Sequence, residues 1–260
     1  MRQRARSGRG AVSTDVIVLL AALFFAVATL YSSVGHAGAS GYIAAMTLVG
    51  MAVPEIRPTA LALNLVVGAI GLVRFARAGF VGWRAVLPLV VASAPMAWVG
   101  ARLTLPPGAH EWALAAVLLV SAIGLLLSAS NAVKNDEGWH ARVPWTWGPL
   151  AGAGIGLVSG ITGTGGAIFL TPLLLFARWA PTREASGISV AFVWINSLLG
   201  LIGLLSVGAT LPAAFPWWVV AVAAGAFLGT QLGLKVLPVP MLRRALALVL
   251  LIAAGKLAFG

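Results

Sequence analysis

The chain has 260 residues, of which 60% are apolar and only 9% are charged, and its mean hydropathy is +1.01. A water-soluble domain of this length needs polar helix or strand faces, and these are nearly absent, so the composition excludes a soluble globular protein. The formal net charge of +11 is spread over loops beyond an arginine-rich N-terminus, which indicates loop anchoring and lipid headgroups rather than nucleic acid.

The N-terminal end carries Arg2, Arg4, Arg6 and Arg9 ahead of a long apolar run. The stretch Ala37-Gly38-Ala39 looks like a signal-peptidase site, so a cleaved signal is one interpretation. Its apolar region should be about 7–15 residues long, whereas this run continues uncharged past that site. We therefore expect an uncleaved first span preceded by a basic cytoplasmic tail, residues 1–14.

Uncharged stretches mark the predicted membrane helices, because an ionisable side chain at the bilayer centre costs roughly 2.5–3.5 kcal/mol. One crossing needs about 20 residues. The first, fifth and sixth stretches are too long for one crossing, which predicts eight to ten membrane segments in an all-α polytopic bundle. In chain order the stretches are 16–54, 58–73, 85–101, 112–133, 143–177, 185–234 and 245–255.

An internal repeat divides the chain. Residues 35–41 (GHAGASG) recur as residues 160–166 (GITGTGG), an offset of 125, and residues 60–64 match 185–189 at the same offset. Gly79 and Gly208 match at 129. We expect two homologous transmembrane repeats, 15–130 and 146–260, joined by a polar loop, 131–145. An odd number of crossings per repeat makes the halves inverted and an even number makes them parallel, and both remain open.

The Gly-rich segments predict broken or re-entrant helices inside the membrane. Irregular backbone is tolerated there only where it lines a cavity or is buried in protein. Glycines leave amide N–H groups accessible, and the helix that follows adds its positive N-terminal end, so each segment is suited to bind an oxyanion. The alternative is close helix packing by small residues. Two such segments with hydroxyl side chains at matched positions favour a substrate pathway.

Several polar side chains accompany these segments. His36 lies in the first segment and could carry a proton, ligate an anion, or simply be a neutral histidine bonded to backbone. Asn64, its counterpart Ser189, and Asn196 could face the same cavity or join helices. The candidate substrate-binding residues are Ser33, Gly35, His36, Gly38, Ser40, Gly41, Asn64, Thr162, Gly163, Thr164, Gly165, Gly166, Ser189 and Asn196.

The sequence contains few residues that are placed to carry out catalysis. The six acidic residues lie near predicted helix ends, and Glu55/Arg57 and Arg183/Glu184 would most simply pin turns by pairing. With no cysteine there is no thiol nucleophile or thiolate metal site. Residues 160–166 lack the lysine that a phosphate-binding P-loop needs. We expect no enzymatic activity, no catalytic residues, no metal and no cofactor.

Taken in register, these motifs make the chain resemble the sulfite exporter TauE/SafE family of membrane permeases. The resemblance runs from about residue 15 to the end. It is carried by the glycines of residues 35–41, by Gly163, Gly165 and Gly166 within 160–172, by residues 60–64, and by the 225–229 stretch.

The resemblance implies a secondary transporter in the cell membrane that exports small sulfur oxyanions such as sulfite or organosulfonates. The expected partners are that inorganic or organic anion, membrane lipid, protons as the coupling ion, and a second copy of the chain in a homo-oligomer, and no nucleic acid is expected. The alternative function is a non-transporting membrane scaffold or assembly protein, in which the glycines serve packing alone.

Overall fold

The structure is a computed structural model that describes residues 13–33, 35–103, 105–106, 108–130, 140–235, 248, 251, 254 and 255. Most of the basic tail (residues 1–12) lies outside the described residues. So do positions 131–139 of the expected polar loop and nearly all of the second repeat beyond residue 235.

Every regular element in the described part of the chain is an α-helix, which confirms the all-α prediction. Five of the helices, α1, α3, α4, α8 and α9, are long and apolar enough to cross a membrane, so the chain is a multi-pass membrane protein. The helices are α1 (Thr14–Ser33), α2 (Ala39–Leu48), α3 (Val53–Arg77), α4 (Trp83–Arg102), α5 (Ala109–Ser130), α6 (Gly148–Thr162), α7 (Ala167–Phe176), α8 (Thr182–Ser206) and α9 (Phe215–Lys235).

The ten-residue helix α2 folds back on α1, whereas the ten-residue helix α7 packs on α8 and α5. Tyr31 and Phe24 of α1 contact Ser40 and Tyr42 of α2, so residue numbers rise along one helix as they fall along the other. At the start of α7, Gly166 lies against α6. Ten helical residues span about 15 Å, half of the hydrocarbon core. Because α2 and α7 are too short for a crossing, we call α1 with α2, and α6 with α7, the two re-entrant hairpins, which turn at the Gly-rich segments.

Two pairs of helices, α1 with α9 and α4 with α6, run parallel and pack through glycine. In α1 and α9, Trp218 Nε1 donates to the Ile17 carbonyl at 3.2 Å, and Gly229 lies against Thr29. In α4 and α6, Gly148 lies against Pro88 and Gly160 against Ala97, with Gly152 and Gly156 between them facing α4. Bare Cα atoms let each pair approach to backbone contact.

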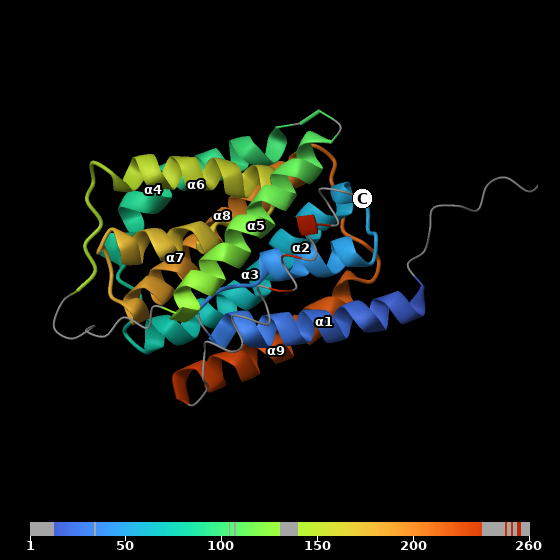
Figure 1. The fold of residues 1–260 in the computed structure, drawn as a ribbon, viewed down its shortest axis with the longest axis horizontal. Helices are drawn as coiled ribbons and strands as arrows, with labels where there is room; N and C mark the ends of the chain where they lie inside the picture. Colours follow the sequence, from blue (N-terminus) through green and yellow to red (C-terminus); the bar gives the residue numbers. More distant parts are fainter. Residues whose placement is uncertain are drawn as a thin grey trace, which may run out of the picture.

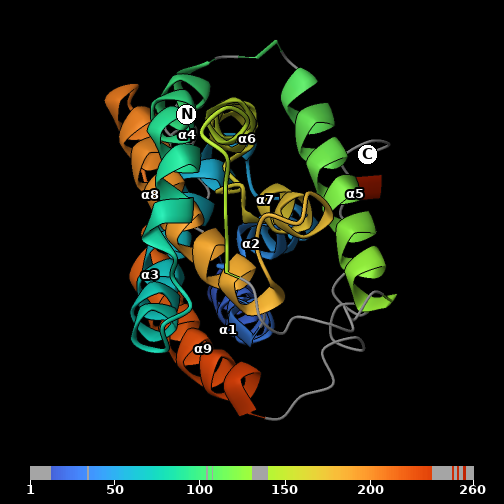
Figure 2. The same cartoon turned by 90° about the vertical axis from the view of Figure 1, so that its left-hand side faces the viewer.

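Helices α3 and α8 cross antiparallel between these pairs. Asn64 contacts Ser197, whereas Gly71, two turns later in α3, contacts Val190, which precedes Ser197 in α8. Figure 1 shows α1 and α9 on one side of the molecule and α4 and α6 on the other, with α3 and α8 between them. Figure 2, turned by 90°, shows α2 and α7 in the interior and α5 on the outer flank.

Candidate functional site

Glycine breaks both re-entrant hairpins. We call residues 35–38 the first tip and residues 163–166 the second tip. Gly35 and Gly38 have φ of 76° and 102°, and Gly163, Gly165 and Gly166 have φ of 78°, 76° and 87°. Only glycine adopts such left-handed backbone without strain. All five glycines are buried, so each chain reversal takes place inside the protein.

The tips place two helix N-termini in the protein interior. Gly38 caps α2 and Gly166 caps α7, and neither helix has a side-chain hydrogen bond at its cap. The first N–H groups of an α-helix have no acceptor within the helix. Together with the positive end of the helix dipole, these N–H groups make each tip attractive to an anion.

His36 joins the first tip to the second half of the chain. Its Nε2 lies 3.2 Å from Thr171 Oγ1 in α7, and that hydroxyl lies 2.7 Å from Ser189 Oγ in α8. The imidazole is half-buried, and its ring meets the Tyr31 ring edge-on at a centroid distance of 6.4 Å. Two of the expected residues, His36 and Ser189, are thus brought together through a threonine.

Asn64 of α3 meets the second tip. Its Nδ2 lies 3.5 Å from the Thr164 carbonyl and 3.3 Å from Ser197 Oγ in α8. A Cβ atom at Gly165 would stand 2.6 Å from Asn64 Nδ2 and 2.9 Å from Ser197 Oγ. The absence of a side chain at this glycine is what lets α3 and α8 reach the tip. Asn64 Oδ1 is buried without a hydrogen-bond partner.

Arg57, in the first turns of α3, also packs on the second tip. A Cβ atom at Gly163 would lie within 3.3 Å of its Cα, Cβ and Cγ atoms. Its Nη2 donates to the carbonyls of Gly160 at 2.8 Å and Ala101 at 3.1 Å, near the C-terminal ends of α6 and α4. The side chain is 8% exposed and its Nε has no partner. Pairing with Glu55, which is exposed, is therefore not its main role.

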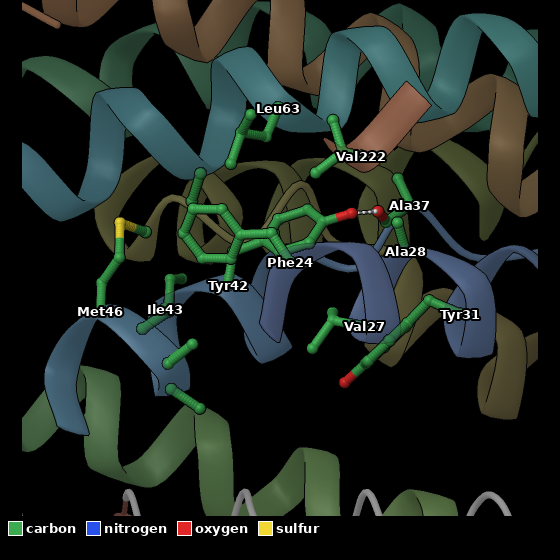
Figure 3. Packing of buried hydrophobic residues seen from close by; sticks show 14 of the residues in the cluster. Phe24, Val27, Ala28, Tyr31, Ala37, Tyr42, Ile43, Met46, Leu63 and Val222 are labelled. Carbon is green, nitrogen blue, oxygen red and sulfur yellow. Dashed lines mark hydrogen bonds between the residues drawn. The ribbon is translucent and has the colours of Figure 1, made fainter. Parts of the chain in front are cut away.

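The first tip is lined by aromatic side chains whose hydroxyls are bonded within the hairpin. Tyr42 donates to the Ala37 carbonyl at 2.9 Å, and Tyr31 lies 2.7 Å from Ser40 Oγ. Figure 3 shows both tyrosines beside Phe24 and Val27, with the Tyr42 hydrogen bond drawn. Gly41 and Gly38 face Val27. Ser40 thus serves the hairpin itself.

The remaining expected residues bond within the protein, Ser33, Thr162 and Thr164 locally and Asn196 between helices. Ser33 Oγ donates to Leu30 O at 2.6 Å within α1. Thr162 Oγ1 donates to Val158 O at 2.7 Å and lies 3.0 Å from Thr164 Oγ1. Asn196 accepts from Ser93 of α4 at 2.9 Å, which is an interhelical contact. Contact with substrate stays a prediction for each of them.

Sequence reasoning did not select Arg57, Thr171 or Ser197. Arg57 is the only ionisable residue between Glu55 and a long uncharged stretch, and that pattern fits an interfacial turn as well as a buried cation. Thr171 and Ser197 are hydroxyls among many, and only the folded arrangement distinguishes them.

Comparison with known proteins identifies the family. Residues 19–257 match the family described as sulfite exporter TauE/SafE. The chain belongs to this family. It is similar to the probable membrane transporter protein y4hK of Sinorhizobium fredii, at 39% identity over 244 residues, or 92% of this chain and 96% of that relative. No solved structure matches it.

Membership of the TauE/SafE family supports a transporter role for the chain, since the family and the relative carry the names of transporters. The two re-entrant hairpins lie within the matched region. Non-helical backbone inside a membrane is tolerated where it is buried in protein or lines a water-filled cavity, and broken helices recur at the substrate sites of secondary transporters.

Proposed function

We propose that this TauE/SafE protein exports a small sulfur oxyanion, sulfite or an organosulfonate, across the cell membrane. The observation that carries the proposal is the pair of buried, glycine-capped helix N-termini without side-chain caps. An unpaired N–H group in a buried site is unfavourable, so these donors favour an anionic ligand. The family is described as sulfite exporters, which favours a sulfur oxyanion over the other anions that such donors could bind.

The energetic problem for any anion transporter is desolvation. An oxyanion leaves water at a large cost unless hydrogen-bond donors replace its hydration shell. Amide N–H groups at helix N-termini do this without a fixed charge for each oxygen, and so they bind an anion without trapping it. His36, bonded to Thr171, is our candidate for coupling transport to protons, because imidazole titrates near neutral pH.

The direct test is flux in proteoliposomes that contain the purified protein. Liposomes loaded with radiolabelled sulfite, sulfate or methanesulfonate are diluted into anion-free buffer, with and without an inward proton gradient. We expect sulfite and sulfonate efflux above that of protein-free liposomes, with stimulation by the gradient. A protein that moves none of these anions in either direction would refute the transport proposal and favour a membrane scaffold.

A further inference from the structure

The two tips are chemically unequal, although both turn at glycines with positive φ. Around the first tip, the hydroxyls of Tyr31, Tyr42 and Ser40 are bonded within the hairpin, while Ser32 Oγ, near the end of α1, is buried without a partner. Around the second tip, three buried polar atoms have no partner: Arg57 Nε, Asn64 Oδ1 and Ser159 Oγ. Buried polar groups are rarely left unpaired in native proteins, so such a group calls for an explanation.

These three atoms belong to side chains that border three different residues of the second tip. Arg57 packs on Gly163, Asn64 packs on Gly165, and the Ser159 Cβ lies 3.4 Å from the position of a Cβ at Gly166. Asn64 and Ser159 have no exposed surface, and Arg57 is 8% exposed. They therefore surround one short stretch of backbone where α6 ends and α7 begins.

Arg57 provides positive charge at this place. Among the described residues it is the only charged side chain that is buried. A charge in a membrane protein interior is expensive and marks a functional site by default. Its two bonds to the carbonyls of Gly160 and Ala101 use Nη2 alone. A guanidinium has five N–H donors in a planar fork, so these bonds leave donors for a ligand.

Asn64 adds a requirement that an anion alone does not meet. Its amide orientation follows from the Thr164 carbonyl, which can only accept, so Nδ2 faces that carbonyl and Oδ1 points elsewhere. Asn64 Oδ1 is itself an amide carbonyl oxygen, so it can only accept a hydrogen bond. A single ligand that satisfies Arg57 Nε, the α7 amides and Asn64 Oδ1 together needs acceptor oxygens and one hydroxyl hydrogen, and the guanidinium and the helix dipole favour negative charge on it.

We propose that the second tip, with Arg57, Asn64 and Ser159, binds one small singly charged oxyanion that carries a hydroxyl, such as hydrogensulfite. This inference rests on the proposed function and narrows its substrate. In the bound state the anion accepts from Arg57 Nε and the first amides of α7, and its hydroxyl donates to Asn64 Oδ1. The first tip does not bind the anion, and its part in transport is proton coupling by His36.

A purely structural role for Arg57 is the rival interpretation. Arginine near a helix C-terminus satisfies the last carbonyls and the negative end of the dipole, and Arg57 does this for α4 and α6. That role predicts a loss of stability on substitution, with no change in ligand affinity in the protein that still folds. The two interpretations therefore separate when stability and binding are measured on the same samples.

The test uses purified full-length protein in detergent at mildly acidic pH, where sulfite is chiefly singly protonated. Calorimetric titration gives the affinity for sodium sulfite and for sodium methanesulfonate, a monoanion without a hydroxyl, and thermal unfolding gives the stability of the free protein. Ser159→Ala is the central variant because it removes an unpartnered hydroxyl. Its matched control is Ser32→Ala, another buried serine without a partner, which lies in α1.

We expect hydrogensulfite to bind the wild type about tenfold or more tightly than methanesulfonate. Ser159→Ala should weaken hydrogensulfite binding about tenfold without lowering the unfolding temperature, and Ser32→Ala should leave the affinity unchanged. Arg57→Gln should abolish binding, while Arg57→Lys retains part of it through its charge.

Equal binding of the two anions, or unchanged affinity in Ser159→Ala, would overturn the inference. If Arg57→Gln does not fold, the serine pair and the two ligands decide the question on their own. If the wild-type protein transports sulfite but either of these results is found, only this site assignment is refuted. If the wild-type protein neither binds nor transports any oxyanion, the proposed function itself is refuted.

Discussion

A side chain at Gly163 would meet two separate obstacles. Its φ of 78° strains any L-residue, and a Cβ would press on Arg57. Gly50 has nearly the same φ, 77°, but open space around it. We expect Gly163→Ala to lower oxyanion flux in proteoliposomes at least about tenfold. Gly50→Ala should cost only the backbone strain of about 1–2 kcal/mol and should keep most of the wild-type flux. Equal loss in both variants would show that strain alone explains the effect.

His36 offers a pH test. Histidine is the side chain best suited to exchange a proton near neutral pH, which makes His36 the candidate for proton coupling. We expect His36→Ala to flatten the pH dependence of flux more than it lowers the maximal rate. His140, whose side chain is 96% exposed and pairs with Glu184, is the control, and His140→Ala should keep the wild-type profile. A His36→Ala profile parallel to that of the wild type removes this histidine from coupling.

For single residues, the sequence predicted the glycines of the two tips better than it predicted the side chains that surround them. Glycine at positions 35, 38, 163, 165 and 166 follows from the need for left-handed backbone, which a sequence can signal. Gly163 and Gly165, however, contact Arg57 and Asn64 of α3, which lie more than 100 residues earlier in the chain. No local pattern distinguishes Arg57 or Ser197 from residues that serve turns or packing.

Among the elements, α6 shows which glycines serve packing. A Cβ at Gly156 would overlap the Ser93 carbonyl of α4, whereas Gly154, on another face of α6, has nothing within 4 Å. We expect Gly156→Ala to destabilise the protein by about 1–3 kcal/mol through overpacking, and Gly154→Ala to stabilise it by about 0.5–1 kcal/mol through helix propensity. Thermal unfolding in detergent measures both. Equal shifts would mean that α4 and α6 do not pack at this distance.

Helix positions followed well from uncharged stretches, and helix breaks followed from glycine clusters. The stretch 16–54 was too long for one crossing, and it contains α1 and the re-entrant α2, with the first residues of α3. The direction of each helix was harder to predict. A sequence does not show whether a helix after a glycine break continues or turns back, because that depends on contacts such as Tyr31 with Ser40.

The directions of the long helices bear on how the whole molecule is organised. The helices matched by the 125-residue offset, α3 and α8, cross antiparallel. The packing is also reciprocal, since α1 lies on α9 while their counterparts α6 and α4 lie on each other. Inverted halves predict this arrangement, which recurs among secondary transporters. Common descent of the halves stays a prediction.

Inverted halves place the ends of α3 and α8 on opposite membrane surfaces. Phe80, just after α3, packs against Gly187 near the start of α8, so the far end of α8 lies a full helix length away. Ala78 and Val207 follow the two helices directly and both are exposed. The chain has no cysteine, so Ala78→Cys and Val207→Cys can each be labelled without background.

With intact cells and inverted membrane vesicles, a membrane-impermeant maleimide should label one of these two variants only from outside and the other only from inside. Parallel halves predict labelling of both from the same side, because equivalent helix ends would then share a surface. Labelling after detergent solubilisation establishes that each thiol is reactive in the folded protein. The result holds whichever surface the N-terminus occupies, since it compares two ends within one chain.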